Sequence, residues 1–73
     1  IYPNPSKGMF TIEGGYIKMV DIMTFDGEVL KRFVNEGYKV KIGVGYLPRG
    51  IYFVRIVTDK GVVLKKIVLE STI

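Results

Sequence analysis

The sequence contains neither cysteine nor histidine. Without cysteine it has no disulfide framework and no thiolate metal site. Without histidine it has no cysteine–histidine zinc site, no serine–histidine–aspartate triad and no imidazole base. The acids that remain for a paired-carboxylate or calcium site are isolated, and each lies near a predicted turn or on a polar strand face: Asp21, Asp26, Glu28 and Asp59. We therefore expect no catalytic residue, no metal and no cofactor.

Long apolar runs and a concentrated charge are also missing. Lysine and arginine total 11 against 7 acids, for a net charge of +4. These basic residues are spread along the chain among the acids, so we interpret them as a solvated surface and expect no nucleic-acid partner. The longest apolar runs, such as Ile51–Val54 and Ile67–Leu69, are too short to span a bilayer, and we expect no membrane insertion.

The length and composition are those of one small globular domain, and we take residues 1–73 as that domain. Nearly half of the 73 residues are apolar and a quarter are charged, which is not the composition of a disordered chain. A chain this short buries only about 60–65% of the surface that its unfolded form exposes, so the core must be thin. Because the chain does not begin with methionine, we expect it to be part of a longer protein.

Short apolar segments alternate with turn signals along the whole chain. Alanine is absent while valine and isoleucine are abundant, which favours strands over helices. The regular spacing is typical of an all-β sandwich or barrel, and we predict a small immunoglobulin-like β-sandwich of six to seven antiparallel strands. The predicted strands are Met9–Glu13, Ile17–Thr24, Glu28–Val34, Lys39–Val44, Ile51–Thr58 and Val62–Leu69. The predicted turns between them are 14–15, 26–27, 35–37, 45–50 and 59–61.

Residues 51–58 show the alternation of a half-buried strand. Tyr52, Val54 and Ile56 share one face, and Arg55 lies on the other. We expect the Tyr52 face to be buried, because an unpaired arginine in the core is costly.

One segment, "DGEVLKRFVNEG" (26–37), has apolar residues at helical spacing. Asp26 and Gly37 are suited to cap the two ends of such a helix. The surrounding strands and the Asp26-Gly27 turn favour a strand instead, and we predict a strand over residues 28–34.

The chain opens with the motif "YPNPSKG". Pro3 and Pro5 push the residue before each of them into extended backbone and cannot donate a ladder hydrogen bond. The sequence of residues 1–5 therefore predicts an extended segment that leads into the first strand. Residues 4–8 then predict a turn, in which Gly8 can take a positive φ.

The stretch "GVGYLPRG" (43–50) is rich in glycine, but it lacks the lysine-serine end of a phosphate-binding loop and no predicted helix follows it. We expect a long connection in which Leu47 enters the core and Pro48 stiffens the bend. The tyrosines leave two interpretations open, a stacking platform for sugars or bases and packing at partly buried edges. They are Tyr2, Tyr16, Tyr38, Tyr46 and Tyr52.

Four motifs follow one another along the chain: "YPNPSKG", "VDIMTFDGEVL", "LPRGIYFVRI" and "KKIVL". In this order they resemble the C-terminal sorting domain of the type IX secretion system, the export route of Bacteroidetes-type bacteria, over nearly the whole chain. The matching residues are Tyr2, Pro3, Asn4, Pro5 and Gly8, then Val20, Ile22, Phe25 and Gly27, then Leu47, Pro48, Gly50 and Tyr52, and finally Lys65, Lys66, Ile67, Val68 and Leu69. Two features depart from the family pattern. Gly43 and Gly45 stand where a polar pair is common, and residues 71–73 follow the usual last strand.

The resemblance implies a non-catalytic secretion signal. Its partners would be the outer-membrane translocon and sortase components of the type IX system, with a cargo domain upstream in the same chain. The cargo would pass through the periplasm and the outer membrane to be secreted or held at the cell surface, often on lipopolysaccharide. Cleavage usually falls upstream of such a domain, and the prolines of residues 1–5 would mark its boundary with the linker.

We expect recognition by pairing along an exposed sheet edge, with Lys65 and Lys66 fixing the orientation. The alternative role of the two lysines is to solvate that edge and prevent aggregation. The alternative function is an accessory immunoglobulin-like or fibronectin-like module of a secreted hydrolase, acting as a spacer or binding carbohydrate. Position in the parent protein distinguishes the two functions, because a sorting domain must come last.

Overall fold

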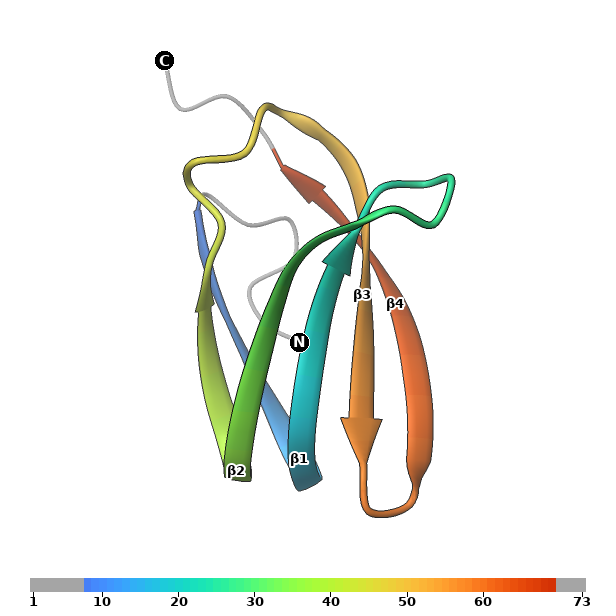
Figure 1. The fold of residues 1–73 in the computed structure, drawn as a ribbon. Helices are drawn as coiled ribbons and strands as arrows, with labels where there is room; N and C mark the ends of the chain where they lie inside the picture. The colour runs from blue at the N-terminus through green and yellow to red at the C-terminus, as the bar shows by residue number, and fades with distance from the viewer. Residues whose placement is uncertain (1–7, 70–73) are drawn as a thin grey trace.

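The computed structural model describes residues 8–69, which form one antiparallel sheet of four strands and contain no helix (Figure 1). The strands are β1 (Met9–Met23), β2 (Val29–Gly43), β3 (Gly50–Thr58) and β4 (Gly61–Leu69). Their order in the sheet is β2-β1-β3-β4, so β1 and β3 are central, and β2 and β4 form the edges of the part of the sheet described. The all-β prediction is confirmed, and residues 8–69 include no helix long and apolar enough to cross a membrane.

The ambiguous segment 26–37 forms a turn and then a strand, as predicted. β2 begins at Val29, and its first residues pair with the end of β1. Phe33 packs against the core, and Arg32 lies opposite Asp21 of β1. Tertiary pairing thus overrides the helical spacing of the apolar residues, as strand context often does.

The number of strands differs from the prediction. Six to seven strands were expected, and residues 8–69 form four. Two expected turns, Gly14-Gly15 and residues 35–37, lie inside β1 and β2, where the ladder between the two strands continues with shifts in register on either side of Ile17. The glycines therefore bend the strands without ending them, which is the role of a β-bulge.

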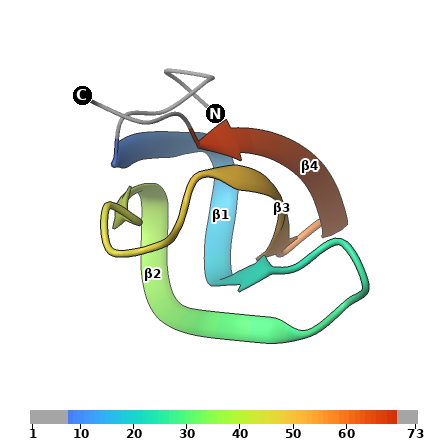
Figure 2. The ribbon, with the colours of Figure 1, turned by 90° about the horizontal axis from the view of Figure 1, so that it is seen from above.

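The bends fold the sheet over its own core. In Figures 1 and 2, β1 and β2 each change direction sharply near the middle, so the first half of β1 and the second half of β2 lie over the rest of the sheet. The buried residues come from both parts and form one cluster: Phe10, Ile12, Ile17, Val20, Ile22, Ile42, Val44, Tyr52, Val54, Ile56, Ile67 and Leu69. One bent sheet thus supplies both walls of the core, whereas the predicted sandwich used two separate sheets.

The bend in β1 requires glycine. Gly14 and Gly15 have φ angles of 110° and 68°, in a region that residues with a side chain rarely adopt. A Cβ on either residue would meet no close contact, so the requirement lies in the backbone conformation and not in space. Next to the bend, the backbone of Tyr16 is held to the β3–β4 turn, because Asp59 N–H donates to the Tyr16 carbonyl at 3.1 Å.

The position of β4 at the edge predicts an alternating pattern of hydrogen exchange. Every second amide of β4 should bond to β3 and exchange slowly, while the amides between them face the free edge and exchange fast. Amides of β1 between Met19 and Met23, which have a partner strand on each side, should all be slow. Residue-resolved exchange measured by NMR on the isolated domain tests this. Uniform protection along β4 would show that its edge is covered.

Candidate recognition surface

The first motif ties the start of the sheet together. Tyr2, Pro3, Asn4 and Pro5 lie outside the described residues, so of this motif the structure places only Gly8. Gly8 has a φ of 110°, as its predicted turn position suggested, and its carbonyl accepts a hydrogen bond from Val44 N–H at 2.8 Å. This bond joins the residue before β1 to the residue after β2.

The second motif contains the turn between β1 and β2. Gly27 N–H donates to the Thr24 carbonyl at 3.0 Å, and Thr24 N–H donates to the Glu28 carbonyl at 2.9 Å. The Thr24 hydroxyl donates to the Asp26 carboxylate, and this bond is the largest cause that holds the pKa of Asp26 below its usual value. Gly27 and Asp26 thus serve the turn, and Phe25 at its tip is 80% exposed.

The third motif anchors the connection between β2 and β3. Tyr52 is buried, as its strand alternation predicted, and its hydroxyl donates to the Pro48 carbonyl at 2.6 Å. Leu47 packs against the core, as expected. Gly50 has a φ of 154°, and a Cβ there would touch the Tyr52 ring at 3.8 Å, an ordinary contact. These residues therefore position the connection.

The fourth motif presents its two lysines on opposite faces of β4. Lys65 lies opposite Val54 of β3, whose side chain is buried in the core, and Lys66 lies opposite Phe53. Adjacent residues of a strand point to opposite sides of the sheet. Lys65 therefore lies on the inner side and Lys66 on the outer side, and both are exposed. The two lysines do not form one patch of charge.

The edge of β4 is a candidate surface for pairing with another strand. β4 bonds to β3 along its whole length and has no other partner strand among residues 8–69. A strand in this position offers a row of backbone donors and acceptors to an incoming chain. An inward-facing charge such as Lys65 is a feature that limits unspecific edge pairing in natural sheets.

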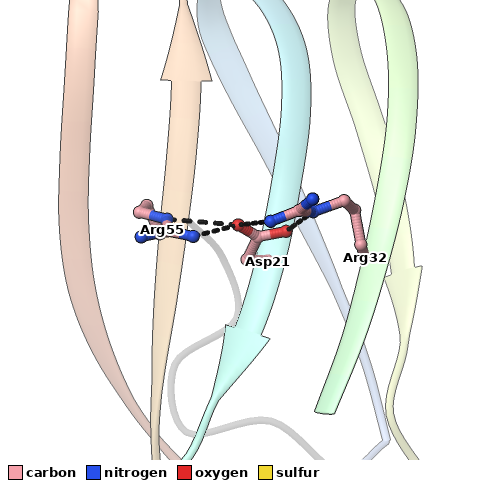
Figure 3. Close-up of polar contacts among 3 residues, drawn as sticks. All are labelled: Asp21, Arg32 and Arg55. Atoms are coloured by element: carbon pink, nitrogen blue, oxygen red, sulfur yellow. Dashed lines mark hydrogen bonds and ion pairs between the residues drawn. The ribbon is translucent and has the colours of Figure 1, made fainter. Parts of the chain in front are cut away.

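A charged cluster on the outer side of the sheet was missed by the sequence analysis (Figure 3). The Asp21 carboxylate lies between Arg32 of β2 and Arg55 of β3, which are its register partners on the two sides. Arg32 Nε donates to Asp21 Oδ1 at 2.7 Å, and Arg55 Nη2 donates to Asp21 Oδ2 at 2.6 Å. The Asp21 side chain is fully buried beneath the two arginines, although it points away from the apolar core.

The arginines decide the ionisation of this carboxyl. The hydrogen bond from Arg32 is the largest cause that lowers the pKa of Asp21, and Arg55 acts in the same direction, while burial opposes both. The same bond raises the pKa of Arg32. Asp21 is thus held as a carboxylate between two cations, and the cluster as a whole carries one net positive charge.

The described residues show no cluster suited to a metal. No group of three or more acidic, histidine or cysteine side chains comes together in residues 8–69. The four tyrosines within residues 8–69 do not form one stacking platform either, because Tyr52 is buried and Tyr16 meets Tyr38 edge to face with ring centroids 5.4 Å apart. Edge packing is therefore the arrangement that the structure shows for this pair.

Comparison with known families gives a match that covers nearly the whole chain. The chain matches the family model described as a secretion system C-terminal sorting domain over residues 1–70, which is nearly its whole length. A search of curated proteins found no match. The family resemblance that the four motifs indicated is thereby confirmed.

Substitution of Tyr52 tests its role as an anchor. Tyr52→Ala should lower the free energy of unfolding by roughly 3–5 kcal/mol, as truncation of large core residues does. Tyr52→Phe keeps the ring but loses the bond to Pro48 and should cost about 1 kcal/mol. Tyr46→Ala, at an exposed tyrosine in the same connection, should change stability by less than about 0.5 kcal/mol. Denaturant unfolding measures all three, and an unchanged midpoint for Tyr52→Ala would place Tyr52 outside the core.

Substitution of Asp21 tests the charged cluster. The pKa of Asp21 is lowered in the folded state from an ordinary value of 3.8, so its stabilising effect is complete above that pH and is lost as the pH falls through the folded-state pKa. Asp21→Asn should be less stable by roughly 2–3 kcal/mol at pH 7, less than for a fully buried ion pair because both arginines are partly exposed. The difference between the two proteins should shrink in acid. Denaturant midpoints from pH 7 to pH 2 measure it, and a constant difference would refute the assignment.

Proposed function

Because the chain belongs to the family of type IX secretion C-terminal sorting domains, we propose that it directs an attached cargo protein across the outer membrane and does no chemistry of its own. The match over residues 1–70 carries this proposal. Membership of the family implies export, contact with the type IX machinery and attachment to a cargo. The translocon and sortase components would be its partners, and the cargo would be secreted or held at the cell surface.

Recognition would use the edge of β4. A strand of the translocon that pairs along this edge would gain backbone hydrogen bonds without any change in the fold of the domain. Lys65 and Lys66 flank the edge on its two sides, so a partner with acidic residues on both sides would be held in one orientation. The free edge of the described sheet and the lysine positions support this mode.

Cleavage would fall upstream of the domain. The prolines of the opening motif remove backbone donors, so this stretch is poorly suited to join the sheet of a cargo domain. An extended linker of this kind would remain open to a protease after export. The support for this step comes from the sequence of residues 1–5.

Deletion of the last strand is a poor test of recognition, because it also damages the fold. Ile67 and Leu69 of β4 are buried in the core. Their removal would expose apolar surface, and a loss of export would then follow from misfolding as readily as from a missing signal. Charge reversal at exposed lysines avoids this, because such charges contribute little to stability.

The expected outcome is that the domain with its native linker exports a foreign folded protein in a host that carries the type IX machinery. Lys65→Glu with Lys66→Glu should fold normally and leave the cargo in the periplasm. Lys60→Glu, which makes the same change of charge as Lys65→Glu or Lys66→Glu alone but in the β3–β4 turn, should export normally. Immunoblots of periplasm and culture medium measure this, with thermal unfolding of each purified domain as the folding control.

Each other result has a definite meaning. If the double variant folds and exports at the normal rate, the lysines only solvate the edge and recognition lies elsewhere. If the intact domain exports no cargo but binds a polysaccharide, it is an accessory module and the proposed function is wrong. The single variants Lys65→Glu and Lys66→Glu distinguish the two sides of β4. Both should weaken binding of a partner at the edge. Only Lys66→Glu should weaken binding of a partner on the outer side.

A further inference from the structure

β4 carries apolar residues on both of its sides. Ile67 and Leu69 are buried in the core, while Val62, Leu64 and Val68 lie on the outer side and are exposed. A strand that is covered on one side only normally alternates apolar with polar residues, and apolar residues on both sides are typical of a strand that is covered on both. The outer side of β4 has therefore the composition of a buried surface.

The exposed apolar surface continues across the sheet. We define the outer face as the side of the sheet that carries Asp21, opposite the core. On this face β4 pairs with β3 as Val62–Val57, Leu64–Arg55, Lys66–Phe53 and Val68–Ile51. Met19 and Met23 continue the same rows on β1, and Val34 continues one of them on β2. Val34 is 82% exposed, Val62 62% and Leu64 57%.

The charges at the centre of the outer face are mostly positive. One row of register partners crosses all four strands and consists of Arg32, Asp21, Arg55 and Leu64. Lys66 lies in the next row. In these two rows three cations thus lie beside one carboxylate. The bonds to Asp21 use Nε and Nη2 of each arginine, which leaves Nη1 of both for a further acceptor. A planar guanidinium group suits a carboxylate in such a position.

We propose that the outer face is a docking surface for a protein partner that presents apolar side chains together with at least one carboxylate. This inference rests on the proposed function, and it places the partner within the export machinery. Apolar rows on a sheet pack against a second sheet at about 10 Å, as in sandwich proteins, and the carboxylate would be held by the arginines beside Asp21. A second copy of this domain fits less well, because face-to-face contact would bring two positively charged faces together.

Paired substitutions separate the apolar part of the contact from its charge. Leu64→Lys and Leu64→Glu remove the same exposed side chain, but only the glutamate opposes a carboxylate on the partner. Val68→Lys and Val68→Glu repeat the comparison at a position opposite Ile51, where a new glutamate has no arginine as register partner. Tyr46→Lys and Tyr46→Glu make the same changes at an exposed residue in the connection between β2 and β3, outside the four strands and the four sequence motifs.

The probe is the purified outer-membrane complex of the type IX system in detergent, and the measurements are its binding to each domain and the export of cargo fused to that domain. The two lysine variants should bind roughly three- to fivefold more weakly than the unchanged domain, and the two glutamate variants at least about tenfold more weakly. Binding of the unchanged domain should fall with added salt. The Tyr46 variants should bind and export normally, and all variants should keep the unfolding midpoint.

Four results would overturn the inference. The first is normal binding and export by the Leu64 and Val68 variants while the unchanged domain is exported, which leaves the proposed function intact. The second is an equal loss of binding for the lysine and the glutamate variants, because the partner then presents no carboxylate to this face. The third is self-association of the domain in sedimentation that Leu64→Glu abolishes, since the occupant is then a second copy. The fourth is binding to phosphatidylglycerol vesicles that Leu64→Glu abolishes, since the occupant is then a lipid surface. Failure of the unchanged domain to export refutes the proposed function and this inference together.

Discussion

The bends at Gly14-Gly15 in β1 and near residues 35–37 in β2 determine how the rest of the sheet is arranged. A sheet of four strands has two faces, and residues 8–69 supply no helix or second sheet to cover either of them. Because both long strands turn back at matching places in the ladder, the sheet covers its own inner face. A bend in one strand alone would break the pairing. The core of Phe10, Ile42 and their neighbours exists only because both strands bend together.

Because the bent sheet covers only its inner face, the outer face stays uncovered. The Asp21 cluster determines how the strands of that face are aligned. A slip of one residue between β1 and either neighbour would turn Asp21 towards the core or take it away from its arginine. An unpaired carboxylate in the core is strongly unfavourable, so the cluster specifies the register of three strands. It also explains how a buried carboxylate is tolerated in so small a domain, because both of its oxygens accept hydrogen bonds from arginine.

The sequence predicted the features that depend on local pattern. Alternation correctly placed Tyr52 in the core and Arg55 on the opposite face, and the turn signals at Asp26-Gly27 and Asp59-Lys60 were correct. Glycines inside the long strands were interpreted as turns, because a bulge and a turn use the same residue and differ only in whether pairing continues. The Asp21 cluster could not be predicted, since it depends on the register that joins residues 11 and 34 positions apart in the chain.

Residues that are neighbours in the sequence are therefore not always neighbours on the surface of this domain. This matters for any partner that binds the domain in its folded state. Lys65 and Lys66 are neighbours in the sequence but lie on opposite sides of β4. Arg32 and Arg55 are far apart in the sequence and meet at one carboxylate. A partner that approached the outer face would contact Lys66 beside Phe53, and only a partner at the edge could contact both lysines. A motif of adjacent residues in this family can thus combine one residue that faces a partner with another that serves a different surface or the fold.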